Sequence, residues 1–339
     1  MTLRFDQEIE LAGRRGLRMH AAEASVDGAR ARFENARRLL ALDVQRAYFQ
    51  AVLAKADRDV AQASLSEIDR AITLNSARFE QGEISGGELR RLQVERLRFV
   101  DDVFAAELAF RNGRSALLAL LNVADLGQIF DVTEPLAPPR GTVPVLMALG
   151  GPPQGPLPST LAAEAMARRP DIVAAQREVF RAETETRLQR ALRTPNVTIG
   201  AGYKRDFGTN AVVFGATVPL PLFNRNQGGL ARAEAVQAQA SNLNRAAENT
   251  VLLEVQQALN GLAINSERVT YIEREYLDTA RESRDIVLAS YRAGAADLID
   301  FLDAQRAFRD TVRTYNRALY EQRISMFQLA AATALPPQQ

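Results

Sequence analysis

The sequence has no cysteine, no tryptophan and one histidine, His20, among its 339 residues. The lack of cysteine excludes disulfides and thiolate chemistry, and a lone histidine excludes a histidine-rich metal site. No apolar run reaches the ~18 residues that a membrane-spanning helix needs, so the sequence encodes no such helix. Positive and negative charge nearly cancel, at 42 basic and 41 acidic residues, and this balance gives no electrostatic reason to expect a nucleic acid partner.

Proline is missing from two long stretches and crowded into a third. None of the 14 prolines lies in residues 1–134 or 222–335, and eight fall between Pro135 and Pro158. A proline inside a helix costs about 3 kcal/mol. The proline-free stretches therefore permit very long helices, and the crowded stretch predicts an irregular connector.

Long helices fit the spacing of apolar residues in both proline-free stretches. From 16 to 76 apolar residues recur at steps of three and four, and the pattern resumes after Gly82. A helix of sixty residues is roughly 90 Å long, more than a globular domain of this size needs. The segment Phe79-Glu80-Gln81-Gly82 matches Tyr291-Arg292-Ala293-Gly294, 212 positions later, so one helical hairpin is used twice.

Strands are predicted in two places. Residues 196–222 alternate apolar and small or polar residues around a turn at 206–210, which predicts a β-hairpin. Its counterpart in the first repeat is a single alternating strand, Thr2 to Leu11. We expect a partner strand to precede Thr2, which this sequence does not contain.

The predicted fold is mainly α with a small β part, built from two direct repeats of long antiparallel coiled-coil helices. The first repeat, 1–125, has one strand and a long helical hairpin. A Pro/Gly-rich connector covers 126–158. The second repeat, 159–339, has shorter helices, the β-hairpin 196–222 and a long helical hairpin at 228–334.

Three motifs carry a family resemblance: VPLPLFNRNQG at 218–228, RPDI at 169–172, and YRAGAADLIDFLDAQ at 291–305. With the doubled order of elements, they resemble the TolC-like outer membrane efflux family, and most of all its cobalt-zinc-cadmium branch. The resemblance implies an α-barrel of helices and a trimeric β-barrel to which each protomer gives four strands. Since three strands are predicted here and the first residues do not form a signal peptide, we expect either a chain truncated at its N-terminus or a start assigned too late.

The resemblance also implies a function, a location and partners. It implies a passive channel across the periplasm in a tripartite efflux system that exports heavy-metal cations, with no cofactor and no resident metal. The implied location is the outer membrane of a Gram-negative cell, with a periplasmic extension. The implied partners are two further copies in a homotrimer, a periplasmic adaptor (membrane fusion) protein, an inner-membrane RND transporter and outer-membrane lipid.

The segment after Tyr291 resembles the periplasmic entrance of the family. Tyr291 matches a residue of the hydrogen-bond network that holds the entrance shut, and Asp300 and Asp303 match its carboxylates. Three residues apart on a helix, these two acids share one face, and a trimer would carry six of them in a ring that attracts cations. The alternative is a solvated acidic helix face. The arginine usual two residues after the glycine is Ala296 here, which puts that part of the lock in doubt.

Two further groups of residues are assigned by the resemblance. The tips of the helical hairpins are where the family meets its adaptor, the alternative being turns with no partner. The junction between the β-hairpin and the next helix combines prolines, which end strand pairing, with a flexible bend, the alternative being an ordinary loop. The tip residues are Phe79, Gln81, Gly82, Ser85, Gly294 and Asp297, and the junction residues are Pro219, Pro221, Asn224, Asn226 and Gly228.

Other functions are weighed against the metal channel. A channel for drugs or organic solutes has the same architecture. A coiled-coil scaffold without a channel has no use for the alternating hairpin at 196–222. An enzyme is not expected, because the sequence contains no phosphate loop, nucleophile motif or metal-ligand cluster.

Overall fold

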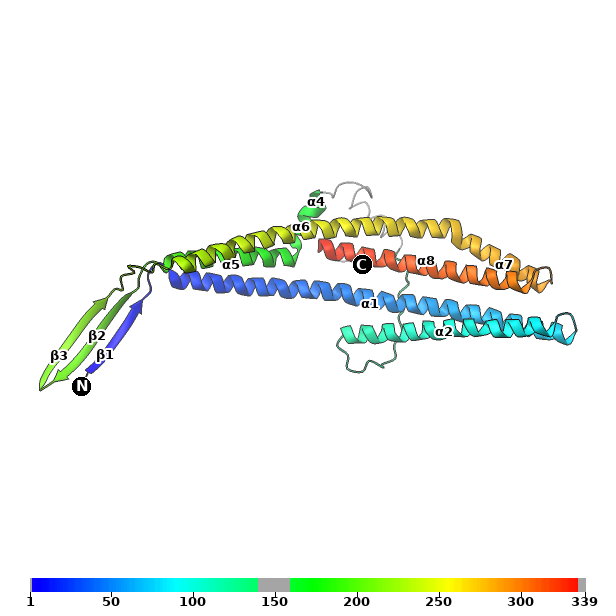
Figure 1. Ribbon diagram of the computed structural model, residues 1–339, viewed down its shortest axis with the longest axis horizontal. Coiled ribbons are helices and arrows are strands. Elements are labelled where there is room, and N and C mark those ends of the chain that lie inside the picture. Colours follow the sequence, from blue (N-terminus) through cyan, green and yellow to red (C-terminus); the bar gives the residue numbers. More distant parts are fainter. Residues whose placement is uncertain (1, 140–158, 335–339) are drawn as a thin grey trace. The chain divides into compact units, whose positions relative to one another are not determined.

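The structure is a computed structural model that describes residues 2–139 and 159–334 (Figure 1). The predicted class, mainly helical with a small sheet, is confirmed. In chain order the elements are β1 (Thr2–Ile9), α1 (Arg14–Glu80), α2 (Gly86–Leu120), α4 (Ser159–Arg168), α5 (Pro170–Ala191), β2 (Val197–Asp206), β3 (Thr209–Thr217), α6 (Gln227–Ile272), the π-helix η1 (Glu273–Leu277), α7 (Asp278–Arg292) and α8 (Leu298–Thr333).

Two compact units divide the chain. Unit 1 comprises residues 1–36 and 166–252, and unit 2 comprises residues 37–165 and 253–339. Each unit takes residues from both sequence repeats. The repeat boundaries at 125 and 159 therefore stay predictions.

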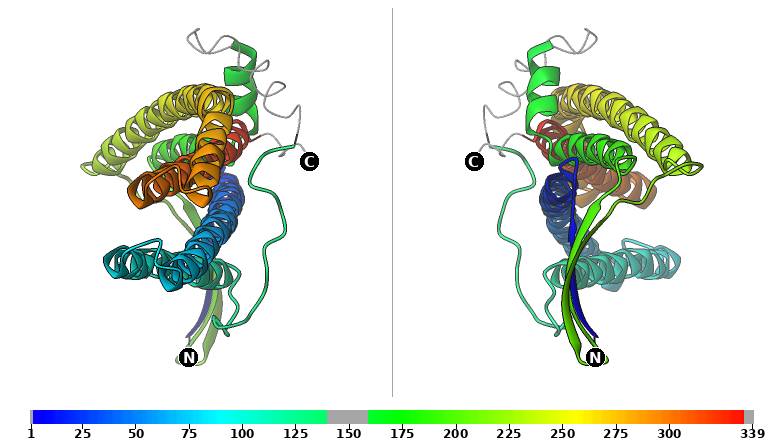
Figure 2. Two further views of the ribbon diagram at one scale, coloured as in Figure 1. Left: turned by 90° about the vertical axis from the view of Figure 1, so that its right-hand side faces the viewer. Right: turned by 90° about the vertical axis from the view of Figure 1, so that its left-hand side faces the viewer.

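The sheet of unit 1 has three antiparallel strands in the order β1-β2-β3 (Figure 1), and Figure 2 shows this sheet nearly edge-on. Thr2 pairs with Lys204 and Ile9 with Val197, so the eight residues of β1 pair with eight of the ten residues of β2. The hairpin turn is tighter than the predicted five residues: Phe207 and Gly208 alone connect the strands, both with positive φ. Two such residues match the twist of the flanking strands.

The sheet is exposed on both faces. Every residue of β1 and β3 is exposed, including apolar ones such as Phe5 at 69% and Phe214 at 79%. The outer edges of β1 and β3 have no strand partner among the described residues. Open edges and exposed apolar side chains are unusual for a sheet in a single folded chain.

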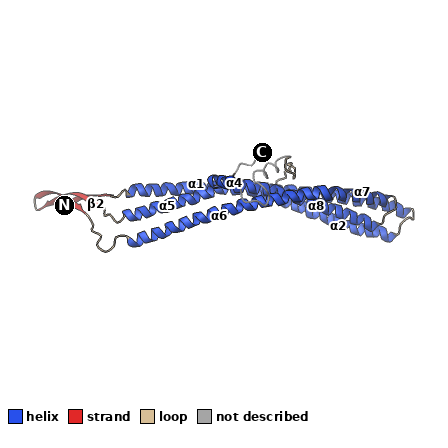
Figure 3. Ribbon diagram, turned by 90° about the horizontal axis from the view of Figure 1, so that it is seen from above, coloured by secondary structure: helices blue, strands red, loops and turns tan. Residues whose placement is uncertain are grey.

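Three helices of unit 1 lie side by side, α1, α5 and α6 (Figure 3). The Arg14 guanidinium donates to the Ala191 carbonyl at 3.3 Å, which ties the start of α1 to the end of α5. An ion pair of 3.0 Å joins Arg190 of α5 to Glu234 of α6. As predicted, Pro170 begins α5, where its missing N–H costs nothing.

Unit 2 contains two antiparallel helical hairpins, α1 with α2 and α7 with α8. The first hairpin packs closely at Gly113, where a Cβ would lie 3.2 Å from the Cα of Ala51. A core cluster joins both hairpins to α6 through buried residues such as Phe49, Phe110 and Leu319. The first helix is longer than the predicted 16–76, since α1 begins at Arg14 and ends at Glu80.

The connector begins with residues 126–139, which contain no helix or strand. Two cations anchor this segment to unit 2. Lys55 binds both carboxylate oxygens of Asp131, at 2.7 and 2.6 Å, and Arg323, 5% exposed, binds Glu134. The rest of the predicted connector, 140–158, lies outside the described residues.

Candidate functional site

The two hairpin turns of unit 2 have the same backbone geometry and lie at the same end of that unit (Figure 1). Gly82 and Gly294 have φ of 76° and 75°, the left-handed conformation that glycine adopts without strain. In each turn the backbone N–H of the residue after the glycine donates a hydrogen bond to the carbonyl five residues earlier. Glu83 N donates to Arg78 O and Ala295 N donates to Ser290 O, both at 2.8 Å. These paired bonds are the Schellman ending of a helix, so the sequence repeat is also a structural repeat.

Each turn is followed by an equivalent helix start. Ser85 precedes α2, and its hydroxyl accepts from the backbone N–H of Glu88 at 3.2 Å. Asp297 precedes α8 in the same extended conformation but makes no side-chain cap. Phe79 is 47% exposed and lies against Gly86, where a Cβ would be 3.3 Å from its ring. Gln81 is exposed in the turn itself.

Tyr291 lies at the centre of the site, although it is next to a turn. The side chain is 2% exposed and its ring stacks on Phe301, with centroids 4.8 Å apart. The hydroxyl accepts a hydrogen bond from the amide of Asn75, on the other hairpin. Burial raises the pKa of Tyr291, against the opposing effect of the Asn75 hydrogen bond, so the phenol stays neutral at physiological pH.

Arg78 is the second link between the hairpins. Its guanidinium donates to the carbonyl of Arg292 at 2.7 Å and to that of Tyr291 at 3.3 Å. It also lies 5.9 Å from the centre of the Tyr291 ring, within the range of a cation–π contact. Ala296, which stands where the family has an arginine, packs partly buried against the apolar cluster around Tyr291. Arg78 thus supplies a positive charge at this turn from the opposite hairpin.

Sequence reasoning missed both Asn75 and Arg78. Asn75 continues the buried spacing of Ile68 and Ala71 on α1, and a polar residue in such a position signals a buried hydrogen bond. Arg78 carried no comparable signal. Its role depends on the second hairpin being brought alongside the first.

Asp300 and Asp303 lie on α8 with their side chains exposed, while Phe301 and Leu302 between them are buried. Asp303 pairs with Arg306 at 2.9 Å. Asp300 makes no hydrogen bond or ion pair with any residue that the structure describes. One chain thus presents two carboxylates on a solvent-facing side, as their spacing predicts, and the ring stays a prediction.

The strand-to-helix junction lies in unit 1, and the strand before it is shorter than predicted. The strand β3 ends at Thr217, five residues before Leu222, because Pro219 and Pro221 have no N–H for pairing. The chain bends at 225–226, and the flexibility of this bend stays a prediction. Asn226, with φ of 58°, is fixed by amide hydrogen bonds to Gln189 O at 3.0 Å and Gln189 Oε1 at 2.7 Å.

The glycine that this junction requires is not the predicted one. Gly228 lies inside α6, where a Cβ would meet nothing within 4 Å. At Gly229 a Cβ would lie 2.3 Å from Asn226 Oδ1. Asn224 contributes by accepting from the Asn226 backbone N–H at 3.0 Å.

Neither a metal centre nor a spanning helix is found in the part of the chain that is described. Within residues 2–139 and 159–334, no three histidine, cysteine, aspartate or glutamate side chains come together to hold a metal ion. None of the helices in those ranges combines the length and the apolar character needed to cross a membrane.

Comparison with known proteins decides the family. The model of the outer membrane efflux protein family matches residues 1–123 and 161–335, nearly all of the chain. The chain belongs to this family. It is thus a component of outer-membrane efflux, and the sequence resemblance is confirmed.

Individual relatives agree with the family. The cobalt-zinc-cadmium resistance protein CzcC of Cupriavidus metallidurans is 28% identical over 310 residues, 90% of this chain and 70% of CzcC. The pyoverdine export outer membrane protein OpmQ of Pseudomonas putida is 28% identical over 186 residues, which cover 52% of this chain and 38% of OpmQ. The chain therefore spans well under half of OpmQ.

A solved structure shows the same fold. The outer membrane protein VceC of Vibrio cholerae superposes with a TM-score of 0.79 at 19% identity, over 98% of this chain and 78% of VceC. The arrangement of long helices and strands in this chain is therefore the fold of VceC.

Proposed function

We propose that this outer membrane efflux protein is the outer-membrane channel of a tripartite efflux system and that it carries heavy-metal cations. The observation that carries the proposal is the similarity to CzcC over 90% of the chain. The channel is a passive conduit, and energy comes from an inner-membrane RND transporter. It lies in the outer membrane of a Gram-negative cell, with its helices in the periplasm.

The active form is a homotrimer. Apolar side chains exposed in one chain support this step, among them Phe104 at 68% and Val94 at 71% on α2, and Phe223 at 92% after β3. Exposed apolar surface of this extent is unusual for a monomer and marks contact with protein or lipid. Neighbouring copies cover the helices and pair with the open edges of the sheet, and outer-membrane lipid covers the apolar side chains of the strands.

The two hairpin turns form the gate. In the closed state Tyr291 and Arg78 tie the α7–α8 hairpin to the α1–α2 hairpin through Asn75 and two carbonyl groups. Opening separates the hairpins and breaks these bonds. Asp300 and Asp303 of three copies line the opening and concentrate cations there.

The hairpin tips dock a periplasmic adaptor protein. The support is their chemistry: an aromatic side chain that is half exposed at Phe79, a free polar side chain at Gln81, and rigid turns at Gly82 and Gly294. Ser85 and Asp297 begin the following helices at the rim of this surface.

Single-channel conductance of the full gene product in planar bilayers tests the proposal. We expect Co²⁺ to block the conductance, and the double variant Asp300→Asn and Asp303→Asn to weaken this block strongly. The matched control is Asp310→Asn, which changes an exposed acid further along α8. Co²⁺ should block the conductance of this variant as strongly as that of the wild type. Unchanged block in the double variant would remove the entrance ring from the proposal.

One alternative cargo has its own support. The match to OpmQ over half of the chain favours an organic solute. Export measured in cells that lack their own channel separates the two, because a metal channel restores cobalt tolerance and an organic-solute channel does not. A scaffold that forms no channel would restore neither cobalt tolerance nor export of an organic solute, and it would show no conductance.

A further inference from the structure

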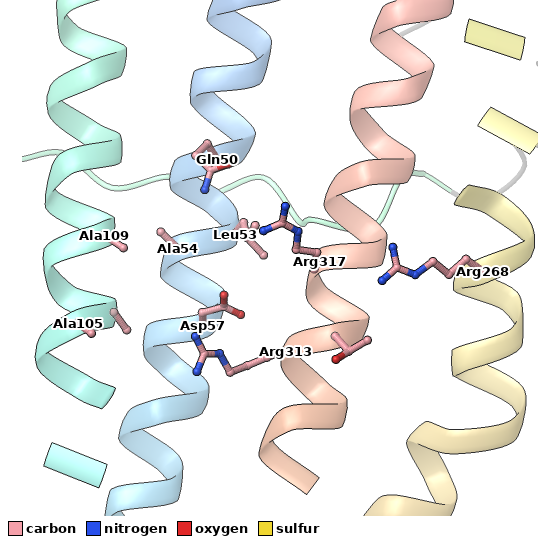
Figure 4. Close-up of a pocket in the computed structure, with 11 residues that line it drawn as sticks. Gln50, Leu53, Ala54, Asp57, Ala105, Ala109, Arg268, Arg313 and Arg317 are labelled. Atoms are coloured by element: carbon pink, nitrogen blue, oxygen red, sulfur yellow. The ribbon is translucent and has the colours of Figure 1, made fainter. Parts of the chain in front are cut away.

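A cavity of about 430 Å³ lies between the helices of unit 2 (Figure 4). Small side chains make it hollow: one wall consists of Leu53 and Ala54 of α1 with Ala105, Ala106 and Ala109 of α2. Sites for small molecules span about 300–1,000 Å³ and have mostly apolar walls with a few polar groups. The volume of the cavity and the apolar character of this wall both suit a small ligand.

The opposite wall is basic. Arg313 and Arg317 of α8 and Arg268 of α6 line it. Two of these arginines donate hydrogen bonds to one carboxylate, that of Glu321: Arg268 at 2.6 Å and Arg317 at 3.0 Å. A guanidinium has five N–H donors. Most donors of both arginines therefore stay available for a ligand.

Arg313 has the least compensated charge of the three. It forms no hydrogen bond or ion pair within the described part of the chain, and Figure 4 shows it extending from α8 toward Asp57 of α1. Asp57 accepts instead from the side chain of Asn316, at 3.2 Å. Burial raises the pKa of Asp57, although the Asn316 bond and the charges of Arg313 and Arg317 oppose this.

The balance of charge at the cavity is positive. Three guanidiniums face two carboxylates, Asp57 and Glu321, and partial burial disfavours the ionised form of Asp57. An anion would give Arg313 the partner that it lacks. Guanidinium groups bind carboxylates and similar oxyanions through paired N–H donors, which gives geometric specificity.

The apolar wall decides between a simple ion and an organic anion. An inorganic ion would leave the alanine side of the cavity empty. A helix of a partner protein is about 10–12 Å in diameter and does not fit the volume. We propose that this cavity binds a small organic anion, whose carboxylate or sulfonate head contacts Arg313 and Arg317 and whose apolar body lies against the alanines of α2.

Calorimetry on the purified protein in its native oligomeric state, in an uncharged detergent, tests the site. Three probes test the basic wall and the apolar wall separately. Naphthalene-2-sulfonate carries both an anionic group and an apolar ring system, naphthalene-2-methanol carries the ring system without the charge, and sulfate carries the charge without the ring system. We expect saturable binding of the sulfonate at one molecule per chain, and binding at least about tenfold weaker for the other two. Arg313→Gln and Arg317→Gln should each weaken sulfonate binding about tenfold.

Matched variants control for folding and for general surface effects. Ala109→Leu fills the apolar side and should weaken binding, whereas Ala307→Leu, on an exposed part of α8 outside the cavity, should not. Arg281→Gln, an exposed arginine of α7, should bind as the wild type does. Since Arg313 is exposed, Arg313→Gln should fold normally, and Arg313→Lys should keep part of the affinity.

Several results would overturn the proposal. These are no saturable binding of the sulfonate, equal binding of the uncharged alcohol or of sulfate, and wild-type affinity in both arginine variants. None of these measurements involves conductance, so the site can fail while the channel proposal stands, and the reverse is also true.

Discussion

Removing the hydroxyl of Tyr291 tests whether the link to Asn75 holds the hairpins together. Tyr291→Phe keeps the ring that stacks 4.8 Å from Phe301 and deletes only the acceptor of the Asn75 amide. The Asn75 amide has two N–H donors, and one of them still donates to Ala71 O at 2.9 Å. The other loses its partner at a residue that is 1% exposed, so the expected cost is about 1–3 kcal/mol.

Asn75→Ala should cost about as much as Tyr291→Phe. It leaves the hydroxyl of Tyr291, 2% exposed, without its partner, and an unsatisfied buried polar group costs about 1–3 kcal/mol. If the bond breaks on opening, the ratio of open to closed channels should rise at least about fivefold in each variant. The double variant should show an effect smaller than the sum, because the two residues share one bond.

The assay is the open fraction of single channels in planar bilayers, with thermal unfolding measured beside it. Arg281→Ala is the control, since Arg281 is exposed and pairs within its own helix with Asp278 at 3.3 Å. A lower melting temperature with an unchanged open fraction would mean that open and closed states lose the bond equally. That result would refute the gate, although the link itself would stand.

Three further changes have defined outcomes. Burial raises the pKa of Asp57 in the folded state, so ionisation opposes folding as pH rises; Asp57→Asn should raise the melting temperature at neutral pH, and the gain should vanish in acid. Gly229→Ala should destabilise by about 1–3 kcal/mol in denaturant unfolding, because its Cβ would lie 2.3 Å from a side-chain oxygen, while Gly228→Ala, in open space within α6, should be neutral or stabilising. Arg323→Met should cost about 2 kcal/mol in the same assay and expose the segment near Glu134 to protease, since the buried guanidinium also lies 4.6 Å from an aromatic ring.

The long helices were predictable from the sequence because a single signal, the absence of proline, combined with apolar spacing over many residues. The hairpin turns were predictable because Gly82 and Gly294 recur in matching contexts. Both features depend on local chemistry. The family resemblance rests on the same local motifs, and the family match agrees with it.

Other features depend on neighbours that the sequence does not reveal. The π-helix Glu273–Leu277 consists of residues that also favour an ordinary α-helix, so the sequence does not predict its irregular hydrogen bonds. Gly229 looks interchangeable with Gly228 until Asn226 is fixed beside it. The residues that line the basic cavity come from four helices that are distant in sequence, α1, α2, α6 and α8. Asp57 and Arg313 become neighbours only when α1 and α8 pack together.

We propose that this chain works as one of three copies around a common axis. Sedimentation equilibrium of the full gene product in detergent gives the molecular mass that tests this assembly. We expect a mass of three chains that persists on dilution. A compact single subunit that is stable in water without detergent would rule the trimer out.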